Sequence, residues 1–295
     1  MSTVEGLTYA EIQGFRPLLL DLHLPARAGA QSPVPVVVWM HGGAFWSGDR
    51  RHLPSNLAPN AVFDTLVAAG IAAATIDYRF SGEARFPAQL HDVRAAIRYL
   101  RSNASTWGLD PARVGVWGES SGGTLGALAA LSPADDSTDS TDAADLPIAA
   151  AATWCSPTDL VALRHFSAIA GLLGDDGDGD ADKLEAAATL ASPVTHVRAD
   201  APPFLIMHGD ADRKVPVDQA ELLHKALIAA GARSEFVPVE GADHVFEGHP
   251  DAQRLVDQVV AFFVRELAPA VQNPRSLSDR TSSSAPKSTD EPRTT

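Results

Sequence analysis

Short apolar runs alternate with amphipathic stretches along most of this 295-residue chain. Apolar runs rich in β-branched residues predict strands, and the stretches between and after them, with apolar residues at helical spacing, predict helices. Because the strands alternate with helices and are apolar on both faces, the pattern predicts an α/β fold with a mostly parallel, doubly wound sheet and helices on both faces. The expected strands are residues 34–40, 71–79, 113–119, 148–156, 203–209 and 234–241, and the expected helices are residues 61–70, 88–108, 122–132, 218–231 and 251–267.

Four segments fall outside this alternation. Residues 7–25 have the pattern of a β-hairpin, which we place at the edge of the sheet. Residues 132–147 are polar and predict a solvated loop, whereas residues 158–202 predict a small insertion or cap over the carboxyl edge of the sheet. Residues 268–295 are rich in Ser, Thr and Pro with few apolar side chains, and predict a disordered tail. We therefore expect a single domain over residues 1–267.

An acidic run at residues 174–182 raises the alternative of a calcium-binding loop. In the helix–loop–helix register that starts at Asp176, position 6 is Ala181 and position 12 is Ala187. The glycine of the sharp turn and the bidentate glutamate are both missing, so we interpret the run as a flexible acidic loop. No other cluster of His, Cys or Asp has the spacing of metal ligands. The sequence therefore predicts no metal and no organic cofactor.

The composition bears on partners and location. A formal net charge of −14 disfavours nucleic acid and anionic membranes, which would repel the protein, so we expect a small-molecule partner and leave the oligomeric state open. The only cysteine, Cys155, lies in an apolar run and is expected to be a buried strand thiol. Residues 1–12 lack the pattern of a signal peptide, and no apolar run approaches the ~18 residues of a spanning helix. These features predict a cytoplasmic protein.

The candidate chemistry begins at "GESSGG", residues 118–123, which follows the predicted strand at 113–119 and opens a helix. Its first five residues fit the G-x-S-x-G pattern of a nucleophile elbow. The glycines remove Cβ atoms where strand and helix approach each other, and they allow a strained backbone at Ser120. The helix N-terminus offers free N–H groups to a developing negative charge. Without the Lys spacing of a P-loop, a phosphate-binding turn is disfavoured, and we predict Ser120 as a nucleophile.

A serine nucleophile needs a base, which we expect on a loop at the carboxyl edge of the sheet after the last strand. His244 lies there, behind small residues, whereas His249 stands next to a proline and fits a surface or helix-start position better. The orienting carboxylate should follow the preceding strand, where Asp210, Asp212 and Asp218 are all candidates. Position along the chain does not decide among these carboxylates.

An oxyanion hole needs a second backbone N–H donor, which is expected after the strand at residues 34–40. His41, Gly42 and Gly43 follow that strand, and the glycines let the main chain approach a substrate oxygen. Alone, these residues could form a tight turn, but together with the elbow they favour an oxyanion hole.

Five motifs, "HGGAFWSG", "DYRFSGEARFPAQLHDVRAAIRYL", "GLDPARVGVWGESSGG", "HGDADRKVP" and "GADHVF", resemble those of α/β-hydrolase fold carboxylesterases. The similarity covers about residues 18–267 and points to the hormone-sensitive-lipase-like and acetylxylan/feruloyl-esterase-like bacterial branch. It implies a serine esterase with a triad of Ser120, His244 and Asp212.

The same resemblance implies an oxyanion hole formed by the N–H groups of Gly43, Ala44 and Ser121. It also implies structural supports near the site at Asp77, Tyr78, Arg79 and Asp92. Many relatives have a third glycine at the position of Ala44, but alanine still presents its N–H. The short N-terminal region and the modest insertion at 158–202 predict a shallow pocket for short-chain acyl esters.

Three other functions share parts of this pattern. An arylformamidase would use the same residues on a small amide, and the sequence does not separate it from an esterase. Hydrolase-like binding proteins lack the catalytic histidine, so the presence of His244 disfavours that alternative. Peptidases of the prolyl oligopeptidase family carry a large propeller domain, for which this chain has no room.

Overall fold

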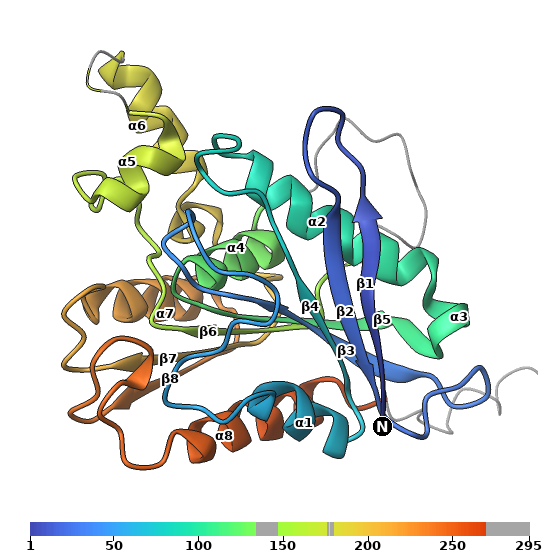
Figure 1. Ribbon diagram of the computed structural model, residues 1–295. Coiled ribbons are helices and arrows are strands. Elements are labelled where there is room, and N and C mark those ends of the chain that lie inside the picture. The colour runs from blue at the N-terminus through green and yellow to red at the C-terminus, as the bar shows by residue number, and fades with distance from the viewer. Residues whose placement is uncertain (134–146, 176, 178–179, 270–295) are drawn as a thin grey trace, which may run out of the picture.

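The computed structural model describes residues 1–133, 147–175, 177 and 180–269. Most of the predicted loop at 132–147, part of the acidic run and nearly all of the predicted tail lie outside these residues. The described chain forms an eight-stranded sheet with the strand order β1-β2-β4-β3-β5-β6-β7-β8 (Figure 1). The strands are β1 (Ser2–Ala10), β2 (Leu18–Leu24), β3 (Val34–Met40), β4 (Ala72–Ile76), β5 (Leu109–Glu119), β6 (Ala150–Trp154), β7 (Phe204–Gly209) and β8 (Ser234–Val239).

The direction of the strands confirms the predicted mostly parallel sheet. β1 and β2 form an antiparallel hairpin at one edge, and β2 pairs antiparallel with β4. From β4 to β8 every neighbouring pair is parallel. The carboxyl ends of β3, β5, β6, β7 and β8 therefore meet at one edge of the sheet, which is where α/β folds build their sites.

Helices cover both faces of the sheet, most of them through one apolar face, whereas α4 (Ser120–Leu131) is buried on nearly all sides. α1 (Ala61–Ala68) and α8 (Ala252–Glu266) pack on one face, and α2 (Ala88–Ser102), α4 and α7 (Asp218–Ala230) pack on the other. β3 is buried along its whole length because both of its faces are covered. This arrangement gives two apolar layers, with the sheet between them.

Three tryptophans form a cluster within the layer under α1 and α8. Trp39, Trp117 and Trp154 come from the neighbouring strands β3, β5 and β6 and are completely or almost completely buried. Their ring centroids lie 4.9–6.1 Å apart in edge-to-face arrangements. Such contacts stabilise the sheet directly below the strand ends that carry the candidate site.

Several predicted elements begin or end a few residues away from their observed bounds, and two further local predictions differ from the structure. The single helix expected over residues 88–108 is divided into α2 and the short α3 (Ala104–Trp107), because Asn103 leaves the helical conformation and its Nδ2 donates to the carbonyl of Tyr99 at 2.8 Å. Cys155 is buried as expected, but it follows β6 rather than lying within it, and its φ is +49°.

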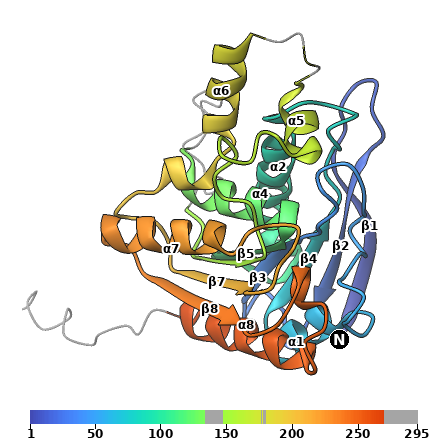
Figure 2. The same ribbon diagram turned by 90° about the vertical axis from the view of Figure 1, so that its left-hand side faces the viewer.

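The segment between β6 and β7 contains α5 (Ser167–Leu173), α6 (Ala181–Leu190) and the 3₁₀ helix η2 (Pro193–His196). Figures 1 and 2 show α5 and α6 beyond α2 and α4, at the end of the molecule opposite α1 and α8. Among the helices of the described residues, none is both long and apolar enough to cross a bilayer.

Candidate active site

Ser120 occupies the sharp corner between β5 and α4, with a left-handed φ of +49°. The flanking glycines are required by close packing. A Cβ atom on Gly118 would lie 2.4 Å from the carbonyl of Gly122, and one on Gly122 would lie 2.2 Å from the carbonyl oxygen of Met40. The corner is therefore pressed against the end of β3, and the strained backbone is held by its surroundings.

His244 and Asp212 meet Ser120 from the ends of two further strands. His244 begins the 3₁₀ helix η3 (His244–Phe246) after β8, and its Nε2 lies 3.0 Å from the Oγ of Ser120. Its Nδ1 lies 2.8 Å from Oδ2 of Asp212, and Asp212 lies on the loop after β7. His244 is 7 % exposed, and the side chain of Asp212 has no exposed surface. With Nδ1 donating to the carboxylate, Nε2 is free to accept the Ser120 hydroxyl proton.

The carboxylate of Asp212 collects several donors. Its Oδ1 accepts the N–H groups of Lys214 and Val215 at 2.8 and 2.9 Å. Its Oδ2 lies 3.2 Å from the Nε2 of His208, a buried residue of β7 whose Nε2 is also 2.9 Å from the carbonyl oxygen of Val215. Burial alone would raise the pKa of Asp212, but the hydrogen bonds from His208, His244 and Val215 hold it well below its usual range. The Asp212 side chain is thus ionised at neutral pH.

The neighbouring acidic residues have other roles. Asp210 is exposed, and its Oδ1 accepts the N–H of Gly241 at 2.7 Å, which ties the loop after β7 to the loop after β8. Asp218 is the first residue of α7, where its charge favours the helix N-terminus. Of the three carboxylates that the sequence leaves open, the structure brings Asp212 to His244.

The loop after β3 has a left-handed backbone at three successive residues, with φ values of +121° at Gly43, +56° at Ala44 and +66° at Phe45. A Cβ on Gly43 would lie 2.0 Å from the carbonyl oxygen of Ser47, so only glycine fits there. In the described part of the chain, the N–H groups of Gly43 and Ala44 have no acceptor. These two donors remain available to a ligand oxygen.

Glu119, which precedes Ser120, supports this loop from the sheet side. Its Oε1 accepts the N–H of Gly42 at 3.1 Å, and within the described residues its buried Oε2 has no partner. Burial raises the pKa of Glu119 to about 7, partly opposed by the Gly42 hydrogen bond. Close by, the Tyr78 hydroxyl donates to the carbonyl of His41 at 2.8 Å, and the two rings stack.

The other expected supports form two ion pairs behind the site. Asp77 accepts the backbone N–H of Arg50 at 2.9 Å and its guanidinium at 3.1 Å. Arg79 and the buried Asp92 form a multidentate pair, with Nη2 and Oδ1 2.7 Å apart. These pairs tie the segment after β4 to α2 and to the loop after β3.

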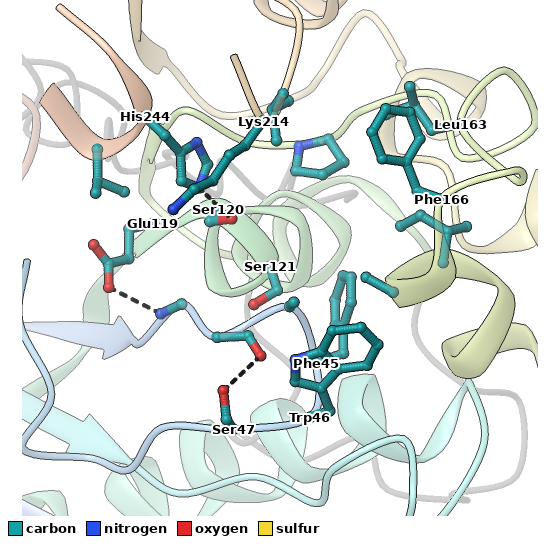
Figure 3. Close-up of a pocket in the computed structure, with 18 of the residues that line it drawn as sticks. Phe45, Trp46, Ser47, Glu119, Ser120, Ser121, Leu163, Phe166, Lys214 and His244 are labelled. Atoms are coloured by element: carbon teal, nitrogen blue, oxygen red, sulfur yellow. Dashed lines mark hydrogen bonds between the residues drawn. The ribbon is translucent and has the colours of Figure 1, made fainter. Parts of the chain in front are cut away.

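A pocket of about 420 Å³ lies directly beside Ser120. Figure 3 shows Phe45 and Trp46 on one side of it, Leu163 and Phe166 on another, and His244 and Lys214 near Glu119. The side chains that line it are largely apolar and include two partly exposed aromatic rings, Trp46 and Phe166. The pocket thus combines an apolar wall with the hydroxyl of Ser120.

One group of potential metal ligands coincides with this site. The ligand atoms of Cys155, Asp212 and His244 lie within 4.8 Å of one another. Burial raises the pKa of the Cys155 thiol well above its usual range, so the thiolate that a metal requires is disfavoured. Asp212 and His244 also already share a hydrogen bond.

Sequence reasoning missed several residues of the site. Glu119 occupies the variable position of the elbow pattern, and the structure reveals its contact with Gly42. His208 could have been noticed as a polar residue at the end of an otherwise apolar strand, "PFLIMHG". Leu163 and Phe166 lie in an irregular segment, and nothing in their local pattern indicates that they line the pocket.

The sheet order and the Ser120–His244–Asp212 contacts define an α/β-hydrolase, and comparisons with solved structures support this class. The truncated form of a carbohydrate esterase from gut microbiota matches with a TM-score of 0.72 at 27 % identity, covering 91 % of this chain and 97 % of that one. The propionate-bound Est2 esterase of Thermogutta terrifontis matches with a TM-score of 0.73 at 26 % identity, covering 90 % and 94 %. The predicted α/β-hydrolase fold is confirmed.

More specifically, the chain belongs to the BD-FAE family, whose model matches residues 20–227. Among curated proteins, esterase LipQ of Mycobacterium tuberculosis is 29 % identical over 267 residues, or 85 % of this chain. Esterase LipC of the same organism is 30 % identical over 243 residues, or 73 % of this chain. The matched regions cover 60 % of LipQ and 54 % of LipC, so the chain spans little more than half the length of these relatives.

Proposed function

We propose that this protein is a serine carboxylesterase that hydrolyses short-chain acyl esters through an acyl-enzyme intermediate. The observation that carries the proposal is the continuous contact from Ser120 Oγ through the His244 ring to Asp212, beside a pocket. The names of the relatives and of the solved structures, which are esterases, support the same reaction class.

In the first half of the reaction, Ser120 is the nucleophile. Its Oγ attacks the ester carbonyl carbon while its proton passes to His244 Nε2, 3.0 Å away. Ionised Asp212 holds the ring in the required tautomer and stabilises the imidazolium. The carbonyl oxygen becomes an oxyanion, which receives hydrogen bonds from the N–H groups of Gly43, Ala44 and Ser121.

The tetrahedral intermediate then collapses. His244 returns the proton to the leaving alcohol, and the acyl group stays on Ser120 as an ester. In the second half a water molecule takes the place of the alcohol, and its oxygen attacks the acyl carbon while His244 Nε2 removes its proton. This second intermediate collapses by breaking the bond to Ser120 Oγ, which takes the proton back from His244 as the acid is released. No metal takes part in this sequence, because the base and the backbone donors supply the activation that a metal would give.

The size of the pocket supports a preference for short acyl chains. Its volume of about 420 Å³ is near the lower end of the ~300–1,000 Å³ typical of ligand sites. Phe166, Leu163 and Ile169 line the part formed by the segment between β6 and β7. A long acyl chain would have to displace these side chains or extend into solvent.

The test is hydrolysis of p-nitrophenyl acetate, butyrate and octanoate by the wild type, by Ser120→Ala and by the control Ser105→Ala, which changes an exposed serine of α3. We expect Ser120→Ala to lose the acylation burst and to lower kcat by a factor on the order of 10⁶, with an unchanged melting temperature. Activity should fall from acetate or butyrate to octanoate and survive exhaustive chelation.

Three outcomes would contradict the proposal. Substantial activity in Ser120→Ala would show that Ser120 is not the nucleophile. A loss of activity on chelation that zinc restores would indicate metal chemistry. Faster turnover of N-formylkynurenine than of every ester would reassign the protein as an arylformamidase.

A further inference from the structure

Among the described residues that line the pocket, Lys214 is the one with a permanent positive charge. Its side chain is exposed, and no carboxylate in the described part of the chain lies within ion-pair distance of its ammonium group. The preceding residue differs in this respect, because the Arg213 guanidinium is paired with Asp243. The charge of Lys214 is therefore available to a ligand.

Lys214 is fixed on the histidine side of the site. Its backbone N–H donates to Asp212 Oδ1 at 2.8 Å, and Asp212 in turn holds His244. In Figure 3 the Lys214 side chain extends across the pocket from the loop after β7, near His244. The hydrogen bond from its backbone to Asp212 therefore fixes the position from which the Lys214 side chain extends.

The apolar wall made by the loop after β3 is on the opposite side of Ser120. Because the strand order is β3-β5-β6-β7-β8, this loop, with Phe45 and Trp46, is separated from the loop of Lys214 by β6 and by β5, which ends just before Ser120. The pocket thus has an aromatic side and a cationic side.

The reaction distinguishes these two sides. His244 must return its proton to the leaving alcohol, so the alcohol oxygen has to lie at Nε2 of His244. The alcohol part of the ester then extends over the loop that carries Lys214. We propose that this esterase prefers esters whose alcohol part carries an anionic group, a carboxylate or a phosphate, and that Lys214 binds this group; the inference rests on the proposed esterase function.

The strongly negative net charge of the protein does not cancel this local effect. Charges more than about 8 Å away are largely screened at physiological ionic strength, whereas Lys214 would contact the ligand directly. The nearest acid lining the pocket, Glu119, is partly neutral at pH 7 because burial raises its pKa to about 7. An exposed ion pair of this kind changes affinity by up to about fivefold, and partial exclusion of water by the pocket increases the effect.

The test compares two pairs of acetyl esters that differ only in charge: 4-acetoxybenzoate with 4-acetoxybenzamide, and O-acetylglycolate with its amide. The quantity is the ratio of kcat/KM for the anionic ester to that for the neutral one. We expect Lys214→Met to lower the ratio about fivefold in at least one pair, Lys214→Arg to preserve it, and Lys214→Glu to lower it further. Lys225→Met, which removes the same charge from the outer face of α7, is the matched control and should leave the ratio unchanged.

The salt dependence gives a second readout. The wild-type ratio should fall as the salt concentration rises from 0.05 to 0.5 M, and the Lys214→Met ratio should stay flat. If Lys214→Met hydrolyses the neutral esters and its ratio equals that of the wild type for both pairs, this inference is overturned. The proposed function would be unaffected by that result. Failure of the wild type to hydrolyse any of the four esters would count against both.

Discussion

Glu119 and Asp212 are two acidic residues close to Ser120. Both side chains are buried, but their pKa values are shifted in opposite directions. Burial raises the pKa of Glu119 to about 7, because only the Gly42 N–H opposes it. Burial acts in the same direction on Asp212, yet the pKa of that carboxyl lies well below its usual range.

The difference lies in the number of donors. Asp212 accepts two backbone N–H groups and faces two histidine rings, whereas within the described residues one oxygen of Glu119 has no partner. A carboxylate with two or three donors keeps its charge even in the interior. Two buried acids can therefore carry different charges around Ser120, with Asp212 ionised and Glu119 close to the midpoint of its titration at neutral pH.

The largest effect is expected when the ionised acid loses its charge. Asp212→Asn keeps the shape of the side chain but favours the wrong tautomer of His244, so kcat for p-nitrophenyl acetate should fall by about 10⁴. The fold should persist, which circular dichroism and the melting temperature would show. A near wild-type kcat in Asp212→Asn would show that Asp212 is not the acid that orients His244.

A smaller, pH-dependent effect is expected at Glu119. Its folded-state pKa of about 7 lies above the ordinary value, so protonated Glu119 favours folding fully below about pH 4.5, and this contribution is lost as the pH rises through 7. The wild type should therefore lose about 3 kcal/mol of unfolding free energy over that interval relative to Glu119→Gln. Urea unfolding of both proteins at pH 4.5 and pH 8 measures the difference. The control Glu240→Gln changes an exposed residue, so its unfolding free energy should change between the two pH values as much as that of the wild type. The same change in Glu119→Gln as in the wild type would contradict the prediction.

Removing one donor from Asp212 should give an intermediate effect. His208→Phe deletes the ring N–H that lies 2.9 Å from the carbonyl oxygen of Val215 and 3.2 Å from Oδ2 of Asp212, and a hydrogen bond to a charged group contributes about 2 kcal/mol. We expect that loss in unfolding free energy, with a smaller reduction of kcat than in Asp212→Asn. The control is His224→Phe, because His224 contacts the neutral hydroxyl of Ser234 and should cost about 1 kcal/mol. Equal losses in the two variants would mean that the charge of Asp212 does not strengthen its contact with His208.

The smallest effect is expected at Asp210. Asp210→Asn keeps an oxygen that can accept the N–H of Gly241, so the unfolding free energy should fall by about 1 kcal/mol or less, with kcat close to wild type. Turnover and melting temperature, measured beside Asp212→Asn, provide the comparison. A nearly inactive Asp210→Asn would transfer the role of the acid to Asp210.

The fold and the catalytic candidates could be predicted because both follow from the ends of strands. Ser120 follows β5 directly, whereas Asp210, Asp212 and His244 lie on the loops after β7 and β8, and parallel strands bring those ends to one edge. The choice between Asp210 and Asp212 was beyond pattern reasoning, since both lie in the same loop. In the structure they differ in direction, with Asp212 turned to His244 and Asp210 to Gly241.

Other parts of the site depend on contacts that no local pattern encodes. The partner of Glu119 lies 77 residues away in the chain, and the contact exists because β3 and β5 are neighbours in the sheet. The break at Asn103 depends on one side-chain hydrogen bond that competes with the helix. Phe166, just before α5, lines the same pocket as Phe45 and Ser120, which are far from it in the chain.

The tryptophan cluster has a spectroscopic consequence. Trp39, Trp117 and Trp154 lie close enough, with ring centroids 4.9–6.1 Å apart, for their excited states to couple, so the near-ultraviolet circular dichroism should be strong and should vanish when β3, β5 and β6 separate. Trp46, 49 % exposed at the pocket, is outside this group and should emit at longer wavelength. The cluster thus reports the integrity of the sheet and Trp46 the occupancy of the pocket, once the constant signal of the fifth tryptophan, the half-buried Trp107 of α3, is removed by Trp107→Phe.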